Sequence, residues 1–313
     1  DTKDYVEFTP GILRTMVHTK HMKKIQVLHS HYLHKAKIIH GEVKEFNTKE
    51  VFVLGKKIPY DYLFVCSGSH YNTPIKGKNI VLPNRAQELR KAHAQLESAQ
   101  EILIVGGGIV GVELAAEILY FYPEKHITLV HAKGCLMDRC IPRVQGYAQD
   151  FFSRRGATLY YNEYLDVKQG KFITSSGKEI HADLCFFCTG IIPNTKLFQK
   201  HFASSLNGKK EVIVEDTLQI AKHPHIFVVG DLNDILEEKT AQGAEKQAQV
   251  AVENLFALEK GEKLVSYSTF PKFRVISLGR FDGILMYKHF ILTGILPALL
   301  KWFVEWKTMI HYR

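Results

Sequence analysis

One segment, residues 101–121, constrains the fold of this chain more than any other part of the sequence. It begins with a short apolar run, Ile102–Val105, and continues through a loop with four glycines into a second apolar stretch that ends near Tyr120. A buried strand, a glycine loop and a helix in this order are typical of the first half of a βαβ unit that binds a dinucleotide. We therefore predict such a site here.

Each position of this loop has a physical role in the prediction. Gly106 permits the tight turn, Gly108 lets a pyrophosphate approach the backbone, and Gly111 allows the helix to pack closely on the strand. The N-terminus of the following helix would supply N–H groups and the positive end of its dipole to the phosphates. The predicted nucleotide-binding residues are Gly106, Gly107, Gly108, Ile109, Val110 and Gly111.

The end of the next strand predicts which nicotinamide cofactor is used. An acid is expected about 20 residues after the loop, where it hydrogen-bonds the ribose 2′-hydroxyl. The strand Ile127–Val130 is instead followed by His131, with Lys133 close behind. Neither residue repels a 2′-phosphate, so we expect NADPH to be accepted alongside NADH. In the alternative interpretation, His131 is only a polar residue at a strand end.

Strands and helices alternate along most of the chain, which indicates a parallel sheet in an α/β fold. The expected helices cover residues 84–98, 110–120, 142–155 and 242–258, with a further apolar helical segment near the C-terminus. The expected strands are Ala36–Ile39, Val51–Leu54, Tyr62–Val65, Glu101–Val105, Ile127–Val130, Ala157–Tyr161, Lys171–Thr174, Leu184–Cys188, Ile226–Val229 and Arg274–Leu278.

The formal charge of +9 over 313 residues favours anionic partners such as nucleotides or an acidic membrane surface. The densest basic stretch, residues 18–24, is too short for a nucleic-acid-binding tail, so nucleic acid is not the expected partner. We expect this stretch to be exposed. Its histidines have no cysteine partners at the spacing of a compact metal site, and no metal is predicted.

The five cysteines do not form a disulfide framework in so long a chain, and a reducing compartment is expected. The first residues lack the apolar core of a signal peptide, and no run of 18 apolar residues could span a membrane. We expect a cytoplasmic or mitochondrial protein, peripheral to a membrane if it contacts one.

Three further strands end in a similar way, at Ser67-Gly68, Thr189-Gly190 and Gly230-Asp231. With the loop at Gly106, this order resembles the flavoprotein NAD(P)H oxidoreductases that nest two dinucleotide folds. Within that superfamily, Gly111–Glu117, Tyr122–Lys125, Ser277–Gly283 and Trp306–Met309 look like the apoptosis-inducing-factor-like branch, in particular the ferroptosis-suppressor-type quinone reductases. Residues 240–247 are closer to type II NADH dehydrogenases.

The resemblance implies a domain order. Residues 1–98 would form the first part of an FAD-binding domain, 99–196 the NAD(P)-binding domain, 197–258 the second part of the FAD domain, and 259–313 a C-terminal α+β region for an interface or membrane contact. The family begins with its own glycine loop for FAD, and none precedes Asp1. We therefore expect an FAD domain that is incomplete at its N-terminus, and a chain that is a fragment.

The resemblance also implies which residues bind the cofactors. Asp231, after Gly230, would hydrogen-bond the flavin ribityl chain, and the helix from about Gln242 would run beneath the flavin ring. Asp1 matches the acid that holds the ribose of the flavin adenosine, and Pro10 would lie near the ring. Gly190, at the end of its strand, is also a predicted cofactor-binding residue.

The reaction implied by the resemblance is hydride transfer from NAD(P)H through FAD to a quinone-type acceptor. Glu113, placed on the first turn of the helix, matches a glutamate near the nicotinamide and flavin, where it could position the carboxamide or assist protons to the quinone. It could instead be a helix-start acid favoured by the helix dipole. Two other functions stay open: a flavin-free NAD(P)-binding or interaction module, and a disulfide reductase that would use Cys135 and Cys140.

The C-terminus predicts a membrane contact. Residues 290–300 carry no charge but are too few to span a bilayer. The following residues 301–307 place Trp302 and Trp306 four apart on one helical face, and Trp favours the membrane–water interface. We expect residues 290–307 to lie on an anionic membrane surface, from which a lipid-soluble quinone is reached. A core helix or a homodimer interface is the alternative.

Overall fold

The computed structural model describes residues 1–71, 74–76 and 81–313, and it divides the chain into two compact units. Unit 1 comprises Asp1–Thr2, Ile39–His70 and Ile191–Lys272, and unit 2 comprises Lys3–Ile38, Tyr71–Gly190 and Phe273–Arg313. Each unit is therefore interrupted in sequence by the other, and the predicted α/β class with nested segments is confirmed.

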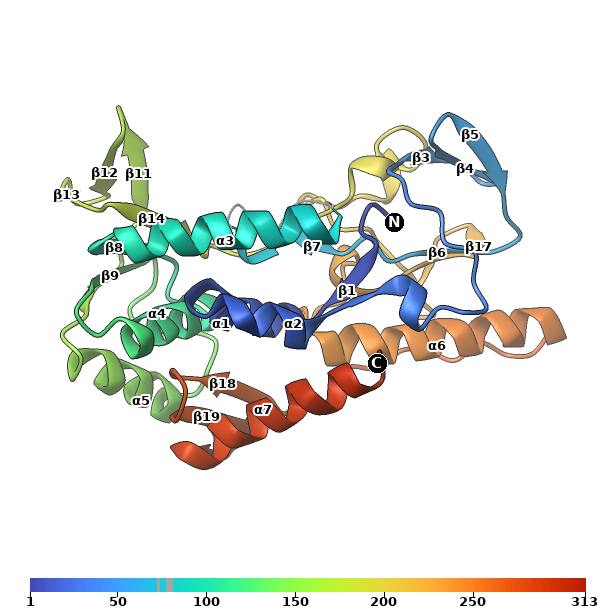
Figure 1. Ribbon diagram of the computed structural model, residues 1–313. Coiled ribbons are helices and arrows are strands. Elements are labelled where there is room, and N and C mark those ends of the chain that lie inside the picture. The colour runs from blue at the N-terminus through green and yellow to red at the C-terminus, as the bar shows by residue number, and fades with distance from the viewer. Residues whose placement is uncertain (72–73, 77–80) are drawn as a thin grey trace. The chain divides into compact units, whose positions relative to one another are not determined.

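A parallel four-stranded sheet forms the centre of unit 2, with the strands in the order β10-β9-β8-β14 (Figure 1). Its strands are β8 (Glu101–Val105), β9 (His126–His131), β10 (Thr158–Tyr161) and β14 (Leu184–Phe187). Alternate residues of β8 enter two separate clusters of buried apolar side chains, with Ile102 and Ile104 in one and Leu103 and Val105 in the other. Both faces of this sheet are thus covered, which explains the unbroken apolar run in β8.

Five helices and two short sheets accompany this sheet in unit 2 ahead of its C-terminal part. The helices are α1 (Ile12–Val17) with α2 (Met22–Ile25), α3 (Leu82–Ser98), α4 (Ile109–Phe121) and α5 (Pro142–Ser153). The short sheets are β1 (Tyr5–Glu7) with β2 (Gln26–Leu28), and β11 (Leu165–Lys168) with β12 (Lys171–Thr174) and β13 (Glu179–Ile180). Helix α1 packs against both α3 and α4, which is why the N-terminal residues belong to this unit.

The C-terminal part of unit 2 is an antiparallel sheet followed by one helix. Strands β18 (Arg274–Ser277), β19 (Gly283–Tyr287) and β20 (Phe290–Thr293) pair in this order. Gly294 then turns the chain with φ +98°, and α7 (Ile295–Ile310) packs on β18 and β19. The predicted apolar helical segment is therefore preceded by two strands, β19 and β20, that the sequence analysis did not predict.

Unit 1 contains a three-stranded sheet, a meander and a long helix. Strand β17 (His223–Val228) pairs in parallel with β6 (Leu63–Val65) and antiparallel with β16 (Gln219–Ile220). The meander is β3 (Val43–Phe46), β4 (Glu50–Val53) and β5 (Lys56–Pro59), and β7 (Ser69–His70) pairs with β15 (Ile192–Pro193). Helix α6 (Ala241–Lys260) is capped by the side chain of Thr240 and ends at Gly261, whose φ of +68° suits glycine.

Two local predictions were wrong. Ala36–Ile39 forms no strand, because this stretch is largely exposed and belongs to none of the sheets of the described residues. The basic stretch near residue 21 is only partly exposed: Lys23 and Lys24 face solvent, whereas His21 is buried. Unit 2 also contains residues 3–38 and the described part of residues 71–98. The predicted domain order assigns these residues to the FAD domain instead, and that order stays a prediction.

Candidate active site

The glycine loop between β8 and α4 has the geometry of a dinucleotide cradle. Gly106 has φ +108°, and a Cβ there would lie 2.4 Å from the carbonyl oxygen of Cys188. A Cβ on Gly111 would lie 1.9 Å from the carbonyl oxygen of Gly106, so only glycine lets α4 start this close to the strand. A Cβ on Gly108 would meet nothing within 4 Å, which leaves open space at the helix start for a pyrophosphate.

The start of α4 is free to receive an anion. Gly108 occupies the N-cap position, and no side chain in the described part of the chain caps this end. The N–H groups of Ile109, Val110 and Gly111 belong to the first turn, which has no intrahelical acceptors. A pyrophosphate would accept these donors at the positive end of the helix dipole. The loop residues named from sequence therefore fit NAD(P)H.

The strand end beyond this loop differs from the sequence expectation in one respect. His131 is the last residue of β9, and its ring lies against Gly107, where a Cβ would be 3.0 Å from the His131 Cγ. Its Nε2 lies 3.3 Å from Oδ1 of Asp138, a residue that the sequence analysis did not single out. A carboxylate in the loop seven residues after the strand end was the signal that could have found it.

The flank of this site is formed by the end of β14. Gly190 follows that strand with φ +119°, and a Cβ there would meet nothing within 4 Å. Cys188, two residues earlier, contacts both Gly106 and Gly111 from this side. The structure thus places Gly190 in the unit that holds the nucleotide loop, next to the strand end that supports it.

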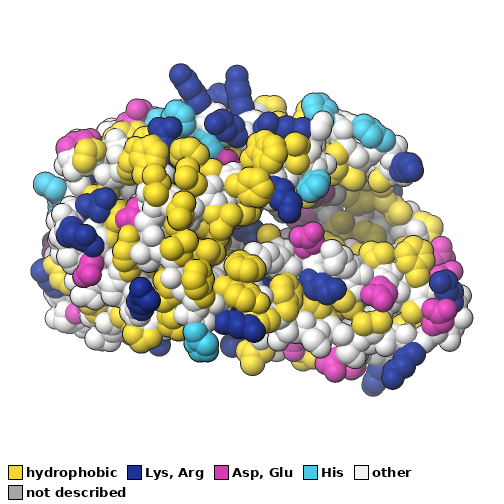
Figure 2. All heavy atoms as spheres, turned by 90° about the horizontal axis from the view of Figure 1, so that it is seen from below, with side chains coloured by type: hydrophobic (Ala, Val, Ile, Leu, Met, Phe, Trp, Pro, Cys, Tyr) yellow, Lys and Arg dark blue, Asp and Glu magenta, His cyan; other side chains and the backbone are white. Residues whose placement is uncertain are grey.

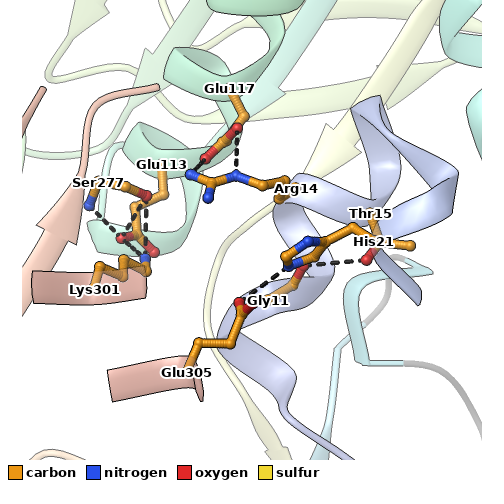
Figure 3. A network of polar contacts seen from close by, with 9 residues as sticks. All are labelled: Gly11, Arg14, Thr15, His21, Glu113, Glu117, Ser277, Lys301 and Glu305. Carbon is orange, nitrogen blue, oxygen red and sulfur yellow. Dashed lines mark hydrogen bonds and ion pairs between the residues drawn. The ribbon is translucent and has the colours of Figure 1, made fainter. Parts of the chain in front are cut away.

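Glu113 is the fifth residue of α4, so it lies in the second turn rather than the first, and the helix-start interpretation of this acid was wrong. Its carboxylate accepts hydrogen bonds from the backbone N–H of Ser277 at 2.7 Å and from the Ser277 hydroxyl at 3.2 Å. The ammonium of Lys301 on α7 forms an ion pair with the same oxygen (Figure 3). Only 7% of the Glu113 side chain is exposed.

Two further polar contacts lie at the same helix contacts. Arg14 on α1 forms an ion pair with Glu117 at 2.7 Å, one turn beyond Glu113 on α4. The Nε2 of His21 lies 3.0 Å from the carboxylate of Glu305 on α7, one turn beyond Lys301 (Figure 3). Three regions that are distant in sequence are therefore joined by ionisable side chains, all of them largely buried. The N-terminal and C-terminal partners in these pairs could not be matched from sequence alone.

Trp302 does not lie on the outer face of α7 as predicted. The guanidinium groups of Arg14 and Arg280 each lie 5.4 Å from its ring, and its indole nitrogen is buried without a hydrogen-bond partner among the described residues. Trp306 is exposed to 59% and keeps the place expected for it.

Unit 1 carries most of the residues assigned to the flavin. Gly230 and Asp231 form a turn at the carboxyl end of β17, where ligands bind in open α/β sheets. The Asp231 carboxylate accepts from the Ser69 hydroxyl at 2.5 Å, and the Gly230 N–H donates to the Gln247 side chain at 2.8 Å. A carboxylate held rigidly on such a turn fits the ribityl hydroxyls of FAD.

The other flavin-assigned residues are distributed over both units. Gln242 is exposed near the start of α6 in unit 1, and Asp1 in the same unit donates its terminal amine to the carbonyl of Ile39 at 3.2 Å. Pro10 is exposed in a short 3₁₀ turn of unit 2. Their roles toward the flavin stay predictions.

All five cysteines are free thiols. Burial raises the pKa of Cys185 and of Cys188 to about 12, so neither supplies a thiolate near neutral pH. Burial likewise raises the pKa of Cys66 to about 11. No group of three or more His, Cys, Asp or Glu in the described ranges could hold a metal ion.

Comparison with known proteins gives a consistent result. A family model described as pyridine nucleotide-disulphide oxidoreductase matches residues 3–254. Human ferroptosis suppressor protein 1 is 31% identical, covering 99% of this chain and 88% of its own length. Apoptosis-inducing factor homolog B of Dictyostelium discoideum is 28% identical, covering 88% of this chain and 79% of its own length.

Solved structures agree on the fold. The sulfide:quinone oxidoreductase of Aquifex aeolicus superimposes with a TM-score of 0.83 at 18% identity, covering 100% of this chain and 84% of its own. NDH2 of Plasmodium falciparum, solved in complex with NADH, gives 0.80 at 15% identity, covering 99% of this chain and 90% of its own. At these identities the likeness extends to the fold alone.

Proposed function

Because the chain belongs to the pyridine nucleotide-disulphide oxidoreductase family and is an oxidoreductase, we propose that it passes electrons from NADH or NADPH through FAD to a quinone. The observation that carries this proposal is the glycine cradle at the start of α4, with Gly108 open to a pyrophosphate and a buried carboxylate one turn further along the helix. Bound FAD would supply the hydride acceptance and two-electron transfer that protein side chains lack.

Different residues of the chain bind the cofactors and transfer protons. The N–H groups of Ile109 and Val110 bind the pyrophosphate of the nicotinamide cofactor, and Asp231 with Gly230 holds the flavin ribityl chain. Glu113, Ser277 and Lys301 form a hydrogen-bonded cluster with two proton-carrying groups on one carboxylate. We assign to this cluster the delivery of protons to the reduced acceptor, with Glu113 as the central acid–base group.

The outer face of α7 supports a quinone as the acceptor. Leu296, Leu299, Phe303, Trp306 and Ile310 recur at spacings of three and four residues and are each at least 45% exposed. The inner face of the same helix carries Lys301 and Glu305, which contact Glu113 and His21, beside the buried residues Pro297, Ala298 and Met309. The helix therefore has apolar residues on both sides, whereas an ordinary surface helix has a polar outer face.

The exposed apolar face of α7 suits contact with a lipid surface. Apolar side chains gather on the face of the molecule that carries α7, and basic side chains project along one edge of it (Figure 2). Lys20, Lys23 and Lys24 are exposed on the segment that includes α2, which packs against α7. Apolar residues beside lysines suit an interfacial helix on an anionic bilayer, where a lipid-soluble quinone is available. None of the helices in the described ranges is long and apolar enough to cross a bilayer.

The test uses the natural full-length protein. We expect its absorbance spectrum to show stoichiometric bound flavin, and NADH to reduce a short-chain ubiquinone analogue with turnover that is insensitive to thiol alkylation. Absence of flavin would support a nucleotide-binding module instead, and loss of turnover on alkylation would support a disulfide reductase. Glu113→Gln should slow turnover at saturating NADH by a factor of about 100, the usual loss on removing an acid–base group.

A further inference from the structure

The segment between β9 and α5 folds back onto the nucleotide loop. The N–H of Met137 donates to the carbonyl of Gly107 at 2.7 Å, and the N–H of Cys140 donates to the carbonyl of Met137 at 2.7 Å. The buried side chain of Leu136 sits where a Cβ on Gly107 would be 2.6 Å away. Asp138 is therefore fixed between two anchored residues beside the predicted cofactor site.

The side chain of Asp138 reaches the strand end at which the cofactor ribose is recognised in this type of fold. Its Oδ1 lies 3.3 Å from Nε2 of His131, close enough for an ion pair, although the geometry is not that of a hydrogen bond. The His131 Nε2 is buried without a hydrogen-bond partner among the described residues. Asp138 keeps 31% of its side chain exposed, whereas His131 keeps 11%.

A second carboxylate near this strand end is already engaged. Glu163 accepts the hydroxyl of Ser175 at 2.5 Å and the N–H of Ser176 at 3.0 Å. These hydrogen bonds lower the pKa of Glu163 to about 2 and engage one of its carboxylate oxygens. The carboxylate of Asp138 is partly exposed beside His131, and the neighbouring Lys133 and Arg139 are exposed.

We propose that Asp138, borne on the loop rather than on the strand, selects between NADH and NADPH. This inference rests on the proposed use of a nicotinamide cofactor at the glycine loop. The carboxylate accepts a hydrogen bond from the ribose 2′-hydroxyl of NADH and repels the 2′-phosphate of NADPH, while His131 orients it. The protein then has a higher kcat/KM for NADH. This proposal differs from the expectation of comparable use, which was drawn from His131 and Lys133 and counted no carboxylate at the site.

The experiment measures binding and turnover separately in the full-length flavoprotein. Calorimetry gives the Kd of NAD⁺ and of NADP⁺, and steady-state assays give kcat/KM for NADH and NADPH. Asp138→Asn should raise the NADPH-to-NADH preference about tenfold in both readouts, and Asp138→Glu should preserve the wild-type preference. Asp166→Asn, which removes an exposed carboxylate on β11 of the same unit, is the matched control and should leave the ratio unchanged.

An unchanged ratio in folded Asp138→Asn, with NADH turnover intact, would overturn the inference and leave the proposed function standing. A shifted Kd ratio in a protein that does not reduce quinone would contradict the proposed function and leave this inference standing. If Asp138→Asn fails to fold by circular dichroism, His131→Gln provides the second variant. It removes the neighbour that orients the carboxylate and should lower the preference for NADH by a factor of about three.

Discussion

Helices α4 and α7 are both rich in apolar residues, yet they are buried differently. Nine of the 13 residues of α4 are buried, because the helix lies within the main core of unit 2. Three of the 16 residues of α7 are buried, and its apolar stripe faces outward. The charges of both helices meet on the inner side of α7, where Lys301 contacts Glu113. The apolar content of a helix thus does not show which of its sides packs against the rest of the protein.

The largest expected effect follows from breaking the charge pair that joins the two helices. Lys301→Met leaves the buried carboxylate of Glu113 without its counter-charge, and this typically costs about 3–5 kcal/mol in the free energy of unfolding. Denaturant titration measures the loss. The double variant Glu113→Gln with Lys301→Met should recover most of it, since no unpaired charge remains. A single variant as stable as wild type would show that the pair is solvated and that α7 is held by its apolar contacts.

A smaller loss is expected at the start of α4. Gly111→Ala places a Cβ 1.9 Å from the carbonyl oxygen of Gly106, so the helix must move away from the strand, at a cost of about 1–3 kcal/mol. The affinity for NAD⁺ should fall as the cradle opens. Gly146→Ala in α5 is the control: its Cβ would meet nothing within 4 Å, and the exchange should stabilise the helix by about 0.5–1 kcal/mol. Equal losses in both variants would contradict the close approach.

The smallest effect on stability is expected on the outer face of α7, where substitutions should instead change binding to membranes. Phe303→Glu with Trp306→Glu changes two residues that are 53% and 59% exposed, so the melting temperature should stay close to that of wild type. Co-sedimentation with liposomes containing anionic lipid should be lost. Leu236→Glu is the control, because Leu236 is 95% exposed in unit 1 and lies outside the stripe. Unimpaired sedimentation of the double variant would exclude α7 as the lipid contact.

Trp302 shows where helical spacing misleads. Trp302 and Trp306 are four apart, and the sequence placed both on the membrane side. In the structure the guanidinium groups of Arg14 and Arg280 each lie 5.4 Å from the ring of Trp302, so Trp302→Glu would bring a new charge into a packed contact instead of weakening lipid binding. Helix periodicity gives relative directions around an axis, whereas the packing partners decide which direction is inward.

The sequence by itself determined the strand, glycine loop and helix at residues 101–121 and the α/β class. Gly106, Gly108 and Gly111 could be assigned from order and spacing because a strand, a tight turn and a helix are local structures, whose requirements for φ and for space are met by adjacent residues. The strand Glu101–Val105 was also predicted with its observed bounds, since burial on both faces leaves an unbroken apolar run.

Only the tertiary structure decided the partners of the charged residues. Lys301 lies 188 positions from Glu113, and His21 lies 284 positions from Glu305, so no spacing rule connects them. Asp138 is near His131 in sequence, but it joins the site because the intervening loop is anchored to Gly107. Ion pairs and loop positions depend on which elements pack together, and that choice is made by the whole buried core rather than by any one segment.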